Sequence, residues 1–256
     1  MDQPHGIQLD AVSKTFHGRG KTVEALKEVS LGCPPGSFTA LIGPSGCGKS
    51  TIMRIALGLE AADAGTVLIE GQPPEAARAS GVTGVAFQDA ALLPWRTVRR
   101  NVALPLEVLG RDPGAHRETV DAMIGLVGLA GFEDSLPGEL SGGMRQRVAI
   151  ARALVTSPAV LFMDEPFGAL DQILRRQMNV ELQRIWSETG STALLVTHGI
   201  DEAVFLADRV AIMASNPGRI VETIDIPFAR PRETGLFASP GFHELNDHIA
   251  GVLHGG

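Results

Sequence analysis

The sequence of 256 residues predicts an α/β fold with a mixed sheet core and an inserted helical subdomain. Short apolar runs typical of strands alternate with helical patterns along most of the chain, as in an α/β sheet. The central runs are almost continuously apolar, as expected of parallel strands covered on both faces. The alternation stops between Pro94 and Leu140, where only helical patterns occur.

The predicted elements follow one another in a regular order. Strands are predicted at residues 6–16, 22–33, 37–43, 82–87, 159–164, 192–198, 209–214 and 219–226. Helices of the core are predicted at residues 49–60, 143–155, 172–188 and 200–207, and helices of the subdomain at residues 97–110 and 116–130. A turn signal, Asn216 to Gly218, separates the last two strands.

The chain is expected to divide at residue 226. Residues 1–226 form one predicted domain, and the helical subdomain at about 94–145 is inserted into it. Residues 227–256 form a predicted C-terminal tail that is rich in Pro and Gly, with one amphipathic stretch at 243–253.

Composition excludes several classes of protein. The chain has 22 basic and 29 acidic residues, a net charge of −7, and no basic block, so no nucleic-acid partner is expected. Its two cysteines are too few for a disulfide framework and indicate a reduced, intracellular protein. No signal peptide is expected at the N-terminus. No apolar run reaches the roughly 18 residues needed to cross a bilayer, so another subunit would have to hold the chain at a membrane.

One glycine-rich stretch predicts a phosphate-binding loop. The sequence GPSGCGKS fits the P-loop pattern, and it follows an apolar strand run and opens a helix. Its glycines allow backbone N–H groups to converge on phosphate oxygens at a helix N-terminus. Lys49 is expected to reach the β- and γ-phosphates, as both a binding and a catalytic group, and the Ser50 hydroxyl to bind Mg²⁺. The predicted ATP-binding residues here are Gly43, Pro44, Ser45, Gly46, Cys47, Gly48, Lys49, Ser50 and Thr51.

An acidic pair ends a second apolar strand run. In VLFMDEP, Asp164 is placed to hold Mg²⁺ beside the phosphate loop, and Glu165 to act as general base on the attacking water. A solvated acidic pair at a strand end is equally common. The P-loop elsewhere in the chain favours the functional interpretation.

Five motifs in order resemble a known family: GPSGCGKST, FQDAALLPW, LSGGMRQR, VLFMDEPFGALD and LLVTHG. Together they are similar to the ATP-binding subunit of ABC transporters, from Ile7 to about Ile226. The resemblance implies a P-loop NTPase fold of the ABC ATPase type, with a small antiparallel β part beside the core. It also implies ATP and Mg²⁺ as cofactors, and ATP hydrolysis coupled to transmembrane solute transport.

The resemblance explains why one chain carries two glycine-rich phosphate sites. In this family two subunits pair head to tail, and each ATP lies between the P-loop of one chain and the LSGG motif of the other. The resemblance therefore assigns Ser141, Gly142 and Gly143 to the ATP of a second copy. Because ATP would bind the closed pair better than the open subunits, ATP would shift the population toward closure.

Further residues take roles from their place in the motifs. Gln88 matches the glutamine that senses Mg²⁺ and the attacking water, and His198 matches the histidine near the γ-phosphate. Asp171 matches the family's dimer-crossing loop. Phe16 is placed to stack on adenine, and an ordinary strand-end aromatic is the alternative interpretation. Gly199 stands where relatives often have Asp, which weakens the start of the next helix by about 0.5 kcal/mol or less.

Four stretches resemble one branch of the family, the importers of nitrate, sulfonates and taurine: LLPWRTVRRNVALPLEVLG, DEPFGALD, DEAVFLADRVAIMASNPGRI and PFARPR. The branch implies a homodimer at the cytoplasmic face of the inner membrane, docked under permease subunits. These subunits would receive the solute from an extracytoplasmic binding protein. Trp95 and Arg96 stand where the permease would dock, and Trp95 is either a docking residue or part of the core of the helical subdomain. An exporter or lipid transporter of the same fold is the alternative. The intact set of catalytic residues disfavours a non-catalytic module.

Overall fold

Two sheets form the centre of the protein. The computed structural model describes residues 6–18, 21–112, 114–168 and 170–255. Residues 1–5, at the start of the predicted domain, and residue 256, at the end of the predicted tail, lie outside the described residues. The prediction that the N-terminus is not a signal peptide falls partly on residues 1–5. A six-stranded sheet has the order β5-β6-β7-β3-β8-β9, and a three-stranded sheet has the order β2-β1-β4.

The six-stranded sheet is mixed. Its strands are β3 (Phe38–Ile42), β5 (Thr83–Phe87), β6 (Val160–Asp164), β7 (Thr192–Thr197), β8 (Arg209–Ala214) and β9 (Arg219–Asp225). All neighbouring pairs are parallel except β8 and β9, which are antiparallel. The carboxyl ends of β3, β6 and β7 therefore meet at one edge of the sheet, and loops that follow these strands can share a site.

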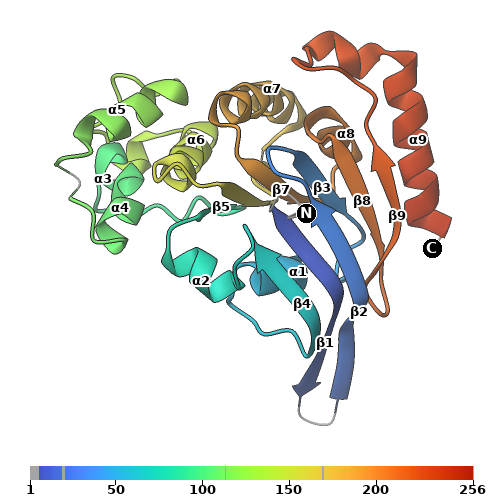
Figure 1. The fold of residues 1–256 in the computed structure, drawn as a ribbon. Coiled ribbons are helices and arrows are strands. Elements are labelled where there is room, and N and C mark those ends of the chain that lie inside the picture. Colours follow the sequence, from blue (N-terminus) through green and yellow to red (C-terminus); the bar gives the residue numbers. More distant parts are fainter. Residues whose placement is uncertain (1–5, 19–20, 113, 169, 256) are drawn as a thin grey trace.

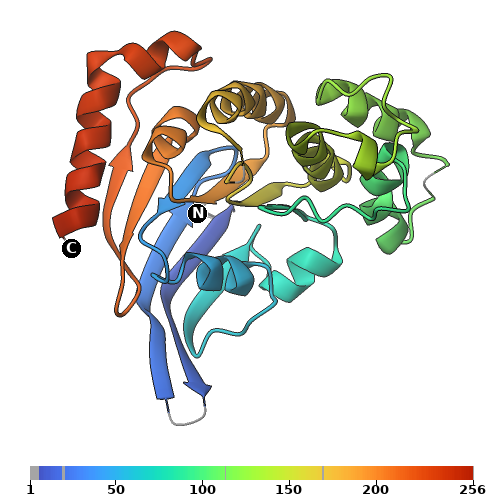
Figure 2. The same ribbon diagram turned by 180° about the vertical axis from the view of Figure 1, so that it is seen from behind.

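Both faces of this sheet are covered, which explains its continuous apolar runs. Along β3, Phe38, Ala40 and Ile42 belong to one core cluster, whereas Leu41 belongs to the other. The same alternation holds in β6 and β7, because successive side chains of a strand point to opposite faces. Figures 1 and 2 show α6 (Gly142–Leu154), α7 (Gln172–Thr189) and α8 (Ile200–Leu206) along one face, and α1 (Lys49–Ala56) with the second sheet on the other.

The second sheet is entirely antiparallel. It joins β1 (Ile7–Gly18) to β2 (Lys21–Cys33) and to β4 (Ala64–Ile69). The prediction of a mixed core with a small antiparallel part is thus confirmed. The strand β4 and the short helix α2 (Pro74–Ala79) were not predicted.

Short helices fill the region where the strand pattern stops. They are α3 (Val98–Val102), α4 (Leu104–Val108), α5 (Arg117–Leu126) and the 3₁₀ turn η1 (Pro137–Glu139). Figure 1 shows them as a group at one end of the molecule, beyond β5, where they pack beside α6. The limits of the helical subdomain stay a prediction.

The C-terminal residues pack on the core. The 3₁₀ turn η2 (Thr234–Ala238) and the helix α9 (Pro240–Gly255) follow β9, and α9 is longer than the predicted amphipathic stretch. Phe237, Phe242 and Ile249 are buried in the same cluster as α7 and α8. Figure 1 shows α9 flanking β9 at the opposite end from α3–α5. A division at residue 226 stays a prediction.

Candidate nucleotide-binding site

The phosphate loop lies between β3 and α1, as the sequence predicts. Gly46 and Gly48 have positive φ angles of 80° and 99°, a conformation that favours glycine. A Cβ on Gly48 would also lie 2.5 Å from Leu26 Cδ2. The local sequence is therefore required by backbone geometry, because a side chain at Gly48 would be strained and would collide with β2.

Lys49 is folded over its own loop. Its Nζ donates to the carbonyl oxygens of Gly43 and Pro44 at 2.6 and 3.0 Å. Cys47 is fully buried beneath the loop, and a Cβ on Gly43 would lie 2.7 Å from the Cys47 Sγ. The ammonium is thus held against carbonyl oxygens of its own loop.

A pocket of about 310 Å³ lies over this loop. The predicted residues in its lining are Ser45, Gly46, Gly48, Lys49, Ser50, Thr51 and Glu165. The other lining residues, to which no motif assigns a role, are Val23, Glu24, Ala25, Asn216 and Gly218. They come from β2 and from the turn between β8 and β9. The turn signal at Asn216 to Gly218 was the one sequence clue to this wall of the pocket.

The acidic pair and the histidine meet beside the pocket. Asp164 ends β6 and Glu165 follows it, while His198 follows β7, the neighbouring parallel strand. The His198 Nδ1 lies 3.2 Å from the Glu165 Oε2. Glu165 has a positive φ of 47°, and its backbone N–H donates to the Val196 carbonyl at 2.8 Å.

The electrostatics around Asp164 suit an oxygen-binding cation. Burial and the charge of Glu165 raise the pKa of Asp164, and the charges of Lys49 and Arg54 oppose this rise. A nearby Mg²⁺ would relieve the same repulsion, and carboxylate and hydroxyl oxygens are its preferred protein ligands. Asp164 and the exposed Ser50 therefore fit the predicted metal-binding role.

The LSGG motif lies away from the P-loop pocket. Ser141 caps α6, its Oγ accepting from the Met144 N–H at 3.3 Å. Gly142 lines a second pocket of about 690 Å³, and neither Ser141 nor Gly142 is among the described residues that line the P-loop pocket. Gly143 is buried, and a Cβ there would lie 3.4 Å from Leu174.

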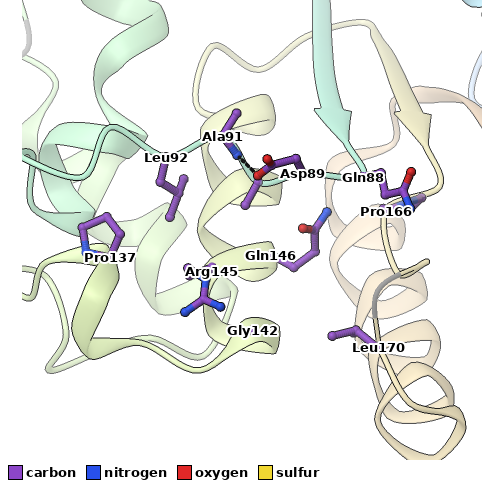
Figure 3. Close-up of a pocket in the computed structure, with 11 residues that line it drawn as sticks. Gln88, Asp89, Ala91, Leu92, Pro137, Gly142, Arg145, Gln146, Pro166 and Leu170 are labelled. Atoms are coloured by element: carbon purple, nitrogen blue, oxygen red, sulfur yellow. Dashed lines mark hydrogen bonds between the residues drawn. The ribbon is translucent and has the colours of Figure 1, made fainter.

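Figure 3 shows the second pocket between three segments. Gln88 and Asp89 follow β5, Arg145 and Gln146 lie on α6, and Pro166 follows Glu165. Gln88 therefore lines the second pocket with Pro166 and α6, and it is not in the lining of the P-loop pocket. Within the pocket wall, the Gln146 Nε2 donates to the carbonyl of Phe87, the residue before Gln88, at 3.0 Å.

Three other predicted residues lie as follows. Asp171 is the N-cap of α7, and its Oδ1 accepts from the Leu174 N–H at 2.9 Å. Phe16 is 40% exposed and pairs across the β1–β2 hairpin with Val23, which lines the P-loop pocket. Trp95 is 72% exposed, so the interpretation of this residue as core is wrong.

A P-loop with its lysine, an acidic pair at the tip of one strand and a histidine at the tip of the next define a P-loop ATPase. The chain belongs to the ABC transporter family, whose ATP-binding domain matches residues 26–168. The predicted ABC ATPase fold is therefore confirmed. Within the described residues, every helix is too short or too polar to span a bilayer.

Several relatives cover nearly the whole chain. The chain is 43% identical to the taurine import ATP-binding protein TauB of Rhizobium johnstonii, over 97% of this chain and 96% of the relative. It is 40% identical to the aliphatic sulfonates import ATP-binding protein SsuB of Bacillus cereus, over 95% and 94% of the two chains. A dimeric structure of a bacterial ABC transporter cassette matches with a TM-score of 0.75 and 31% identity, covering 87% of this chain and 100% of the cassette.

Proposed function

We propose that two copies of this chain form composite ATP-hydrolysing sites that drive the import of a small oxyanion through a membrane permease. The observation that carries the proposal is the division of the predicted residues between two surfaces. Lys49, Ser50 and Glu165 share one pocket, whereas Gly142 lines another. A second copy, placed head to tail, would supply its LSGG motif to the open side of the first pocket.

The P-loop side would bind the nucleotide. The N–H groups around Gly46 and Gly48 would hold phosphate oxygens, and Lys49 would turn from its own carbonyls to the β- and γ-phosphates. Ser50 and Asp164 would hold Mg²⁺, which neutralises charge that develops on the transferred phosphoryl group. Gln88, which lines the neighbouring pocket, would join them as a further ligand. Phe16, on the same hairpin as the pocket residue Val23, would stack on adenine.

Glu165 would act as the general base. Its carboxylate would accept a proton from the water that attacks the γ-phosphorus, and loss of such a group costs about 10²–10⁴ in rate. The His198 imidazole, 3.2 Å from the same carboxylate, would orient that carboxylate and contact the γ-phosphate. The short distance between these side chains supports their action as one unit.

The solute assignment rests on relatives. Proteins named for the import of taurine, nitrate and aliphatic sulfonates are 40–43% identical to this chain over 95–97% of its length. Each of those solutes is a small oxyanion or carries an anionic oxyacid group. We therefore place the dimer at the cytoplasmic face of the inner membrane, under a permease that receives its solute from an extracytoplasmic binding protein.

An apolar groove supports a permease partner. Phe87, Leu104, Val108 and Leu109 line a groove of about 350 Å³ between β5, α4 and α6. Phe87 and Val108 are 42% and 77% exposed and line the same groove, and contiguous exposed apolar surface is typical of a protein interaction site. Because Phe87 precedes Gln88, a permease segment in this groove would lie one residue from the proposed metal-sensing glutamine.

Co-purification tests the proposal. The tagged chain would be recovered from gently solubilised membranes of its native cell, and its partners identified by mass spectrometry. We expect a multi-spanning permease, and we expect Val108→Glu to lose it while Val221→Glu, on β9, retains it. Recovery from the soluble fraction alone, with nucleic acid or ribosomal proteins, would refute the transporter assignment.

A further inference from the structure

A buried glutamate lies directly behind the histidine of the site. Glu202 is the third residue of α8 and is 5% exposed, and no motif assigns it a role. Its Oε2 accepts a hydrogen bond from the hydroxyl of Thr197, the last residue of β7. Its Oε1 has no hydrogen-bond partner among the described residues, so its burial is costly and calls for an explanation.

The hydrogen bonds of Glu202 enclose His198. The Thr197 Oγ1 also accepts from the backbone N–H of Gly199, at 3.0 Å. In an ordinary capping box, a glutamate at the third helical position accepts directly from the N–H of the N-cap residue. Here Gly199 is the N-cap of α8, and the same link passes through the Thr197 hydroxyl. The residues on both sides of His198 are thereby tied to one buried carboxyl group.

His198 depends on this backbone for its position. Its side chain is 56% exposed, and within the described residues its imidazole makes one polar contact, with Glu165. A change in the turn between Thr197 and Gly199 would therefore move the imidazole relative to the Glu165 carboxylate.

We propose that Glu202 is a positioning residue for His198, acting through the Thr197 hydroxyl and the Gly199 amide. The proposal rests on the proposed ATPase function and adds a residue that touches neither nucleotide nor water. Charged groups near Glu202 are Arg175 on α7, His198 after β7 and Glu165 after β6. Burial raises the pKa of Glu202, which favours the neutral carboxyl group. The role needs only a hydrogen-bond acceptor, which glutamine also provides.

Four variants of the full chain separate positioning from folding. Glu202→Leu removes the acceptor, and Thr197→Val removes the hydroxyl while Glu202 stays. Glu202→Gln and Thr197→Ser keep the hydrogen bonds that join residue 202, the hydroxyl of residue 197 and the Gly199 N–H. Thr192→Val is the matched control, because its hydroxyl accepts from the Gly36 N–H at 3.0 Å at the opposite end of the same strand.

The measurements are steady-state ATP hydrolysis and equilibrium binding of a fluorescent ATP analogue. We expect Glu202→Leu and Thr197→Val to lower kcat about 10-fold or more, with the dissociation constant changed by less than about 2-fold. Glu202→Gln, Thr197→Ser and Thr192→Val should stay within about 3-fold of the wild-type kcat. If Glu202→Leu fails to fold, Thr197→Val decides the same question.

Three results would overturn the proposal. They are a wild-type kcat in Thr197→Val, an equal loss of kcat in Thr192→Val, or a loss in Glu202→Gln as large as in Glu202→Leu. Failure of the proposed ATPase function would give a different result. The wild-type protein would then hydrolyse no ATP, or the Glu165→Gln variant would hydrolyse ATP at the wild-type rate.

Discussion

At the residue scale, Glu165 is held by its backbone. Its φ of 47° lies in the left-handed region, which costs a residue other than glycine about 1–3 kcal/mol. Hydrogen bonds on both sides maintain it: its N–H donates to Val196, and its carbonyl accepts from Gly168 at 3.0 Å. This conformation directs the carboxylate to the pocket and to His198, so strain is concentrated where the proposed chemistry occurs.

Lys49→Ala tests the proposed binding of the β- and γ-phosphates by Lys49. Loss of one preorganised donor is worth roughly 3 kcal/mol in the transition state, so we expect ATP hydrolysis to fall about 100-fold or more. ATP hydrolysis and nucleotide binding are measured together, with the melting temperature as a check on folding. Lys27→Ala, an exposed lysine of β2 outside the pocket lining, is the matched control. Activity equal to that of the control would contradict the assigned role of Lys49.

Cys47 gives a chemical test of the same loop. It is fully buried, so we expect a maleimide reagent to react slowly and each modified molecule to lose ATP binding, because the adduct cannot fit beneath the loop. Burial raises the pKa of Cys33, the other cysteine, to about 12, and Cys33→Ser removes its contribution altogether. Mass spectrometry measures labelling, and nucleotide binding is measured on the same sample. Complete labelling with normal binding would refute this prediction.

Sequence patterns can identify site residues that are close along the chain but not those that meet only in space. The spacing in GPSGCGKS identified Lys49 and Ser50, and both line the pocket with Glu165. Val23 and Glu24 lie on a strand whose pattern is ordinary. No motif assigned a role to Glu202, because its importance comes from a hydrogen bond to the preceding strand.

At the element scale, one buried arginine caps the C-terminus of α8. Arg232 is 3% exposed, and its guanidinium donates to the carbonyls of Phe205 and Ala207 at 2.9 and 2.7 Å. These carbonyls belong to the last turn of the helix, where no intrahelical partner is available. Residues beyond β9 thereby complete a core helix that begins beside His198.

Arg232→Ala should destabilise the protein strongly. The change leaves buried carbonyl groups unpaired and removes a buried side chain, so we expect the free energy of unfolding to fall by about 2–4 kcal/mol. Urea denaturation measures the change. Arg219→Ala, an exposed arginine on β9, is the control and should change it by less than about 0.5 kcal/mol. An Arg232→Ala variant as stable as this control would show that the contact is dispensable.

The two elements that were not predicted, β4 and α2, have weak apolar periodicity for physical reasons. The strand β4 is at the edge of the small sheet and is largely exposed, with Ile69 its one fully buried side chain. It therefore lacks both the alternating and the continuous apolar pattern. The helix α2 is too short to show a helical period. By contrast, β3, β6 and β7 are buried on both faces and were predicted to within one residue at each end.

At the scale of the whole molecule, the separation of the two glycine-rich motifs is the central fact. One motif lies over α1 on one side of the sheet, and the other begins α6 on the opposite side (Figure 1). A single chain thus carries the two halves of a site on separate surfaces, and one partner copy placed head to tail would complete both. The chain's similarity to a solved dimeric cassette, over 87% of its length, supports a closed pair in which both halves are used twice.

The most direct test is ATP-dependent dimerisation of Glu165→Gln, measured by analytical ultracentrifugation. We expect this variant to bind ATP, to hydrolyse it about 10²–10⁴-fold more slowly than the wild type, and to sediment as a dimer only when ATP is present. Adding Ser141→Arg, which alters the LSGG motif but not the P-loop, should leave ATP bound to a monomer. A Glu165→Gln variant that hydrolyses ATP at the wild-type rate, or that stays monomeric with ATP bound, would contradict the composite site.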